Sequence, residues 1–284
     1  MRTKLSFLAI LLAGGTAVLL AQWPKYPTGA PKGPDGKANL TAPAPRTKDG
    51  HPDLSGLWDL ARGAGRGGGK GKEAPPSPVP AALPDDPPIG QFFNIGAGFK
   101  DGLLPFTPWA TALRAERKAN NNKDNPDALC LPIGLTQMHL HPQPRKIIQT
   151  ADVIIMLYEA QAGIRQIFMD GRPLPPKDAE PWWYGYSVGH WDGDTLVVET
   201  TGFRDDVWLD VEGSPLTNTG KMTERMRRVN YGVLQTDVTI EDPKAYTKPF
   251  TIRVNHQIIP DDDLIEFVCE ERDAVHYVGK DGKK

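Results

Sequence analysis

Residues 182–203, WWYGYSVGHWDGDTLVVETTGF, decide the fold. Two runs rich in aromatic and β-branched residues flank Asp192 and Gly193, a dipeptide suited to the two positive φ angles of a type I′ turn. The stretch therefore predicts two antiparallel strands joined by a tight turn. With Asp192 and Gly193 as the turn residues, the predicted cross-strand pairs are Trp191 with Asp194, His190 with Thr195, Val188 with Val197 and Tyr186 with Glu199.

Strand alternation divides the side chains of this hairpin between two faces. Ser187, flanked by glycines on its own face, is expected in the core together with Leu196, Val198 and Thr200. The opposite face combines phenol, imidazole and carboxylate groups, which can hold a polar ligand or move a proton. Its candidate catalytic residues are Tyr186, His190 and Glu199. A wholly solvated face is the alternative.

Gly185, Ser187 and Gly189 match the G-x-S-x-G pattern of a hydrolase nucleophile elbow. An elbow requires a helix directly after the serine, because the strand-to-helix turn exposes the nucleophile. Here a turn and a second strand follow. Ser187 is therefore expected to pack in a sheet and not to act as a nucleophile.

The first 21 residues have the layout of a secretory signal peptide: Arg2 and Lys4, an apolar run to Leu20, and Ala21 as the expected cleavage site. No membrane span is expected after its removal. The mature chain would then be periplasmic or extracellular.

Removing Arg2 and Lys4 leaves 31 basic and 35 acidic residues, a formal charge of −4. This balance argues against a nucleic-acid-binding protein. Two cysteines, Cys130 and Cys269, are expected to form a disulfide in an exported chain, with two unpaired thiols as the alternative.

Composition divides the chain into six segments. They are a signal peptide (1–21), an extended N-terminal segment (22–50), a short strand (51–60), a Gly/Pro-rich linker or loop (61–89), a helix with the cysteine loop (90–145) and an antiparallel β domain (146–279). In the fifth segment, Thr107 is a candidate N-cap and Pro108 suits the first helical position, so a helix is predicted to begin there.

Strand-like runs follow one another through the last segment, separated by Gly, Pro, Asn and Asp. They are residues 146–150, 153–160, 165–169, 183–190, 195–201, 222–230, 234–241, 250–259 and 264–270. So many strands with a single convincing helix predict a mainly β fold. The expected architecture is an antiparallel barrel, calycin-like or lipocalin-like, or a two-sheet sandwich.

The motif W-x-G-x-S-x-G-x-W-x-G-D-T-L-V-V-E-T at residues 183–200 resembles the signature of a large group of secreted bacterial hypothetical proteins. Further matching pieces are PDLSGLW (52–58), TPWA (107–110), CLPIG (130–134), DGRP (170–173), TER (223–225) and DPKAYTKPFT (242–251). The resemblance implies a family without an established activity. Its members often carry a histidine beside the proline of segment 213–216, GSPL here, so no role of that histidine transfers.

Candidate binding residues come from the aromatic hairpin and from a charged strand. Arg225 or Arg228 could reach Glu199 or Asp237 inside a polar barrel and hold a ligand carboxylate or phosphate, surface salt bridges being the alternative. The candidate ligand-binding residues are Tyr184, Tyr186, Arg225 and Arg228.

His139 and His141 stand two apart, so on a strand both would project to one side and could share a divalent metal, completed by His190 or His256. The prolines at 142 and 144 favour a loop instead. No cofactor is the default expectation, with a divalent metal as the alternative.

Three functions follow from these features. The first is a secreted barrel that binds a small ligand of mixed polarity. The second is an exported hydrolase or lyase that uses His190 with Glu199, or a histidine-bound metal. The third is a structural component of the cell envelope. The oligomeric state has no sequence signal.

Overall fold

The computed structural model describes residues 29–61, 78–265, 267 and 269. The predicted signal peptide and most of the Gly/Pro-rich linker lie outside these residues. Within the described residues, no helix has both the length and the apolar character to cross a bilayer.

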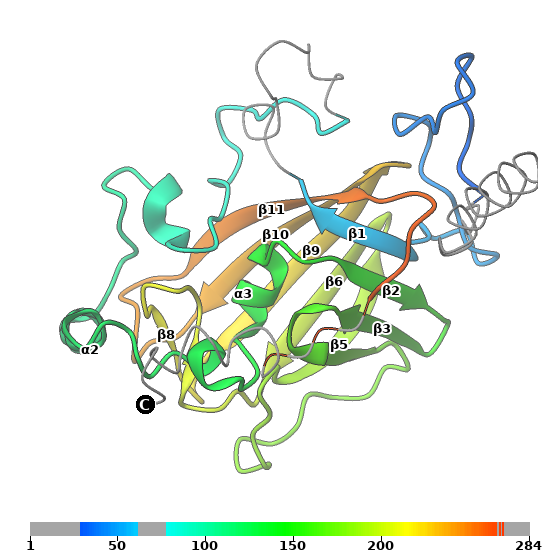
Figure 1. Cartoon of the computed structure of the whole chain (residues 1–284). Coiled ribbons are helices and arrows are strands. Elements are labelled where there is room, and N and C mark those ends of the chain that lie inside the picture. The colour runs from blue at the N-terminus through cyan, green and yellow to red at the C-terminus, as the bar shows by residue number, and fades with distance from the viewer. Residues whose placement is uncertain (1–28, 62–77, 266, 268, 270–284) are drawn as a thin grey trace, which may run out of the picture.

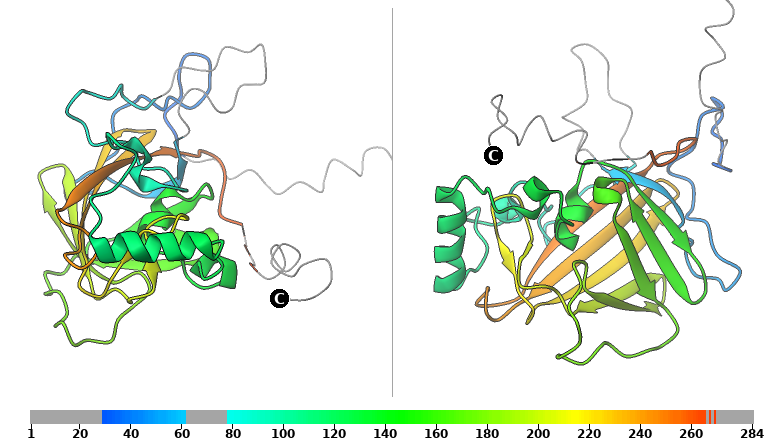
Figure 2. Two further views of the ribbon diagram at one scale, coloured as in Figure 1. Left: turned by 90° about the vertical axis from the view of Figure 1, so that its left-hand side faces the viewer. Right: turned by 60° about the horizontal axis from the view of Figure 1, so that its bottom comes forward.

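Nine strands close into a barrel, in the order β1-β11-β10-β9-β6-β5-β4-β3-β2 (Figures 1 and 2). Their bounds are β1 Gly56–Leu60, β2 Arg145–Gln149, β3 Val153–Tyr158, β4 Ile164–Phe168, β5 Tyr186–Asp192, β6 Thr195–Thr201, β9 Lys221–Asn230, β10 Val233–Glu241 and β11 Phe250–Ile258. β7 (Val207–Trp208) and β8 (Pro215–Leu216) form a separate two-stranded sheet. The mainly β barrel is therefore confirmed, and the sandwich is excluded.

Two helices and three short 3₁₀ turns complete the described structure. They are η2 Ile95–Gly98, α2 Pro108–Ala119, η3 Pro126–Leu129, α3 Leu135–Leu140 and η4 Ala160–Ala162. Thr107 caps α2 as expected, since its side chain accepts a hydrogen bond from the Ala110 N–H at 3.2 Å. α2 lies outside the barrel, whereas α3 is buried along its whole length and contacts the inner face.

Two expectations about the sheet were wrong. β4 and β5 run parallel, joined by the long connection 169–185, so the barrel is mixed and not purely antiparallel. Leu264 and Ile265 are not in a strand, and residues 266, 268 and 270 of that predicted strand lie outside the described residues. β1 occupies the place beside β11 and also pairs with β2, which closes the barrel.

The hairpin register was also predicted wrongly. Asp192 pairs with Thr195, so Gly193 and Asp194 form the turn. Of these two, Gly193 alone has a positive φ, +59°, and Arg46 of the N-terminal segment holds the Asp194 carboxylate through two hydrogen bonds of 2.8 and 2.6 Å. A shift of two residues leaves each side chain on its predicted face. Ser187 and its expected neighbours Leu196, Val198 and Thr200 are indeed buried.

The predicted disulfide between Cys130 and Cys269 is confirmed, with the two Cα atoms 5.7 Å apart. The two cysteines are 139 positions apart in the sequence, so the disulfide links the end of η3 to the chain beyond β11.

Candidate functional site

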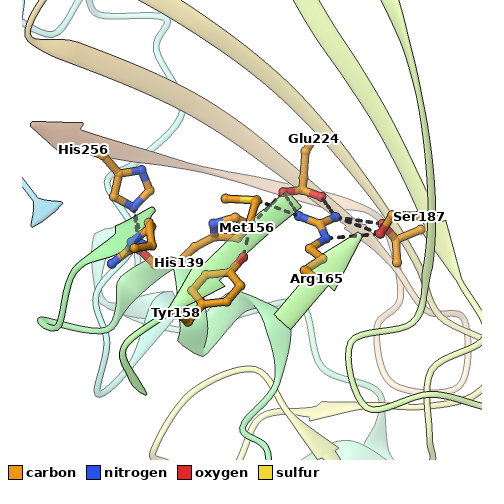
Figure 3. A network of polar contacts seen from close by, with 9 residues as sticks. His139, Met156, Tyr158, Arg165, Ser187, Glu224 and His256 are labelled. Atoms are coloured by element: carbon orange, nitrogen blue, oxygen red, sulfur yellow. Dashed lines mark hydrogen bonds and ion pairs between the residues drawn. The ribbon is translucent and has the colours of Figure 1, made fainter. Parts of the chain in front are cut away.

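A buried ion pair crosses the interior of the barrel between Arg165 on β4 and Glu224 on β9 (Figure 3). Arg165 alternates with the buried Ile167, and Glu224 alternates with the buried Met222 and Met226, so strand geometry turns both charges inward. Arg165 Nη1 donates to Glu224 Oε1 at 3.0 Å, and its Nη2 bonds the second carboxylate oxygen. The pair is thus a two-point contact in a dry environment.

Arg165 also contacts two hydroxyl groups from neighbouring strands. Its Nε and Nη2 lie 3.1 Å from Ser187 Oγ on β5, and Nη2 lies 3.1 Å from Thr200 Oγ1 on β6. Ser187 and Thr200 hydrogen-bond each other at 2.9 Å. The serine of the G-x-S-x-G motif therefore holds an arginine and does not stand beside a base.

His139 approaches the same carboxylate from α3. Its Nε2 lies 2.7 Å from Glu224 Oε1, while Nδ1 is buried and has no hydrogen-bond partner among the described residues. Burial lowers the pKa of His139 although Glu224 acts to raise it. The neutral ring therefore keeps its proton on Nε2, facing the carboxylate, and leaves the Nδ1 lone pair unused.

Glu224 is ionised in this environment. Burial acts to raise its pKa, but the charge of Arg165, with the contacts from His139, outweighs burial and lowers the pKa to about 2. The carboxylate can therefore orient the imidazole of His139 and balance the charge of Arg165 at neutral pH.

A second buried arginine, Arg145, donates hydrogen bonds to backbone carbonyls at the end of α3. Arg145 donates to the carbonyls of His139 and His141 at 2.7 and 2.8 Å, and its Nη1 lies 2.5 Å from His256 Nε2. His256 Nε2 also lies 2.8 Å from the His139 carbonyl oxygen, so Arg145 and His256 meet at the same carbonyl. Burial, with Arg145 nearby, lowers the pKa of His256 well below the usual value.

Two tyrosines lie at the edge of this cluster. The Tyr158 hydroxyl donates to Met156 Sδ at 3.5 Å, and the Tyr158 and Tyr184 rings are 6.3 Å apart. Burial raises the pKa of Tyr184, whose hydroxyl is buried with no hydrogen-bond partner among the described residues. A Cβ at Gly163 would come within 2.6 Å of this hydroxyl, so glycine makes the close packing there feasible.

The three candidate catalytic residues lie on the outside of the barrel. His190 is exposed, Glu199 pairs with Lys221, and Tyr186 packs against Phe168 at 5.0 Å between ring centroids. The serine face turns inward, as the sequence predicted, so the face with these three residues lies on the solvated side, which was the alternative to a ligand pocket. Catalysis by these residues stays a prediction.

Of the candidate ligand-binding residues, Tyr184 points inward and Tyr186 outward. Arg225 is exposed and donates to Asp192 at 2.9 Å. Arg228 donates to backbone carbonyls, among them Asp53 at 2.5 Å and Tyr231 at 2.7 Å. The expected contacts of these arginines with Glu199 or Asp237 do not form, since those carboxylates pair with Lys221 and Arg253 respectively.

His139 and His141 do not lie together on a strand, because His139 belongs to α3 and His141 is the extended residue that ends it. His139 faces Glu224, whereas His141 packs edge-on against Phe92 at 5.1 Å. In the described part of the chain, no group of three or more potential ligands is arranged to hold a metal ion.

A surface hollow of about 320 Å³ lies between α2, the segment around η3, and β7. Its lining includes the rings of Trp183 and Trp208, three leucines, Arg117 and three carboxylates. The Trp208 carbonyl accepts a hydrogen bond from Gln137 of α3 at 3.2 Å, so the hollow and the barrel interior share a wall. We call this feature the α2 hollow.

Sequence reasoning missed Arg165, Glu224 and the α2 hollow. The two charges did carry a signal, because each alternates with apolar residues that belong in a core. The hollow carries none, since its lining residues in the segment 113–131 lie far along the chain from Trp183, Asp206 and Trp208.

Glu224→Gln is expected to lower the free energy of unfolding by roughly 3–5 kcal/mol, because it leaves Arg165 buried without a counter-charge. The control is Glu199→Gln, the same change at a carboxylate that is 35% exposed, with an expected cost of at most about 1 kcal/mol. Urea denaturation measures both. Equal losses in the two variants would contradict the role of the buried pair.

Stability is also expected to fall on the acid side because of Glu224. Its pKa of about 2 in the folded protein lies below the ordinary 4.5, so its contribution is complete above pH 4.5 and is lost as the pH falls towards 2. The gap in unfolding free energy between the wild type and Glu224→Gln should narrow across this window in denaturant titrations. A constant gap would show that the carboxylate does not titrate as described.

No protein-family model matches the chain. No curated protein and no solved structure shows significant similarity to it either. The chemistry of the described residues is therefore the basis for a functional proposal.

Proposed function

We propose that the protein is exported and binds a small ligand of mixed polarity, and that the α2 hollow is the binding site. The N-terminal sequence and the disulfide support export. The hollow lies beside the end of the barrel at which β5 begins and β6 ends, and the mouths of barrels are common ligand sites.

The composition of the hollow is the observation that carries the proposal. Trp183 and the side chains of Leu113, Leu129 and Leu131 offer apolar contact, while the ring of Trp208, which is 2% exposed, lies beneath Arg117. Leu129 is 58% exposed and Leu131 is 40% exposed, so their apolar surface is open to a ligand. Arg117 and the acidic residues supply polar groups that could fix its orientation. A volume of about 320 Å³ lies at the lower end of the range for small-molecule sites, so the hollow suits a small ligand.

The dye 1-anilinonaphthalene-8-sulfonate, an apolar body with one charge, tests this proposal. Saturable 1:1 binding to the mature protein is expected, with at least tenfold weaker binding for Trp183→Ala. Trp182→Ala is the matched control, because this neighbouring tryptophan lies outside the hollow and contacts Tyr186 at 5.2 Å. Fluorescence titration of variants with native circular dichroism measures the affinities.

Absence of saturable dye binding, or equal effects of the two tryptophan variants, would contradict the proposal. The protein would then be better explained as a structural component of the envelope.

A second candidate function is acid–base catalysis, favoured by the imidazole of His139. Its Nε2 is held by Glu224 and its Nδ1 has no partner among the described residues, which is the arrangement of a general base. Such a base could take a proton from water as the water attacks an ester, with the alcohol as leaving group. Nδ1 is buried, so a substrate would reach it only after local rearrangement.

Hydrolysis of 4-nitrophenyl acetate tests this candidate. The wild type is expected to turn over the ester faster than His139→Gln, since glutamine cannot act as the base. A loss of rate in His190→Ala instead would favour the outward-facing His190 over His139. Absorbance of nitrophenolate measures the rates. Equal rates for the wild type and His139→Gln would remove His139 from consideration.

A further inference from the structure

The α2 hollow contains one positive charge in its wall. The Arg117 guanidinium stacks on the Trp208 ring, 4.3 Å from the ring centroid, and its Nη1 donates to the Gly213 carbonyl at 2.9 Å. No carboxylate lies in ion-pair contact with it among the described residues. Burial lowers the pKa of Arg117 to about 10, although the nearby charges of Asp124, Asp210 and Glu116 act to raise it.

The rim of the hollow carries negative charge. Glu116 and Asp124 line the hollow and are exposed, and neither forms an ion pair within the described part of the chain. Asp206 differs, because Arg204 holds it through two contacts of 3.0 Å. The hollow therefore offers two carboxylates and one guanidinium, all still able to pair with a ligand.

This combination favours a ligand with both charges over a ligand of the same shape with only one of them. An anion that pairs with Arg117 must pass two carboxylates on the rim, and a cation attracted to the rim meets the guanidinium in the wall. A ligand with both charges satisfies each group. The apolar wall around Leu129, Leu131 and Trp183 leaves room for an uncharged body.

We propose that the ligand is a zwitterion, an α-amino acid with an apolar or aromatic side chain or a short peptide of such residues. The inference rests on the proposed function and narrows its ligand. The ligand carboxylate pairs with Arg117, because a guanidinium matches a carboxylate with two parallel donors. The ligand ammonium faces Glu116 and Asp124, and the side chain packs between Trp183 and the two leucines.

Three matched compounds test the proposal by isothermal titration calorimetry on the mature protein. L-Phenylalanine carries both charges, 3-phenylpropionate lacks the ammonium, and phenethylamine lacks the carboxylate. Phenylalanine is expected to bind at least tenfold more tightly than either of the other two.

Variants assign each charge to its partner. Arg117→Met should abolish the preference for phenylalanine over phenethylamine, and Arg117→Lys should retain part of it. Glu116→Gln combined with Asp124→Asn should abolish the preference over 3-phenylpropionate. Lys118→Met, on the exposed side of the same helix, is the control and should leave all affinities unchanged.

Three outcomes would overturn the proposal that the ligand is a zwitterion. They are equal affinities for the three compounds, tightest binding of 3-phenylpropionate or of phenethylamine, and no binding of any of them. These results are distinguishable from failure of the proposed function, because dye binding that depends on Trp183 would persist. If the dye also failed to bind, both the zwitterionic ligand and the proposed binding function would be contradicted.

Discussion

The ion pair between Arg165 and Glu224 is the interaction on which the barrel depends most. β4 and β5 meet through two residue pairs in parallel, a short contact between neighbouring strands of the barrel. The side chain of Arg165 extends from β4 into the barrel interior and crosses this contact. It bonds Ser187 on β5, Thr200 on β6 and Glu224 on β9. Charges removed from water are costly unless every partner is in place, so the cluster favours one arrangement of these four strands.

The N-terminal segment completes the barrel from outside the β domain. β1 closes the gap between β11 and β2, and Arg228 fastens the preceding chain by donating to the carbonyls of Asp53 and Ser55. The segment also covers the β5–β6 hairpin, where His51 stacks on Trp191 at 4.7 Å. The barrel thus depends on contacts between residues more than 100 positions apart, whose formation requires the whole domain.

Much of the fold could be predicted because alternation and turn residues are local signals. Most of the strands and the inward face of the hairpin followed from them, and the N-cap Thr107 located the helix. The disulfide followed from the cysteine count and the expected export. The hairpin register did not, because the sequence Asp192-Gly193-Asp194 allows either of two turn positions, and both leave the same side chains on each face. The helix α3 was missed because it is short and buried, and its structure depends on Arg145 and Glu224 more than on its own propensity.

The sequence by itself determined that the chain is mainly β, that Ser187 lies in a core, and which side of the hairpin faces outward. Each of these depends on neighbours within a few residues. Only the tertiary structure decided which charges are buried together and where the α2 hollow lies. Arg165 meets Glu224 across 59 positions, and Arg117 meets Trp208 across still more, so sequence spacing carries no record of either contact. The candidate chemistry of this protein depends on such contacts.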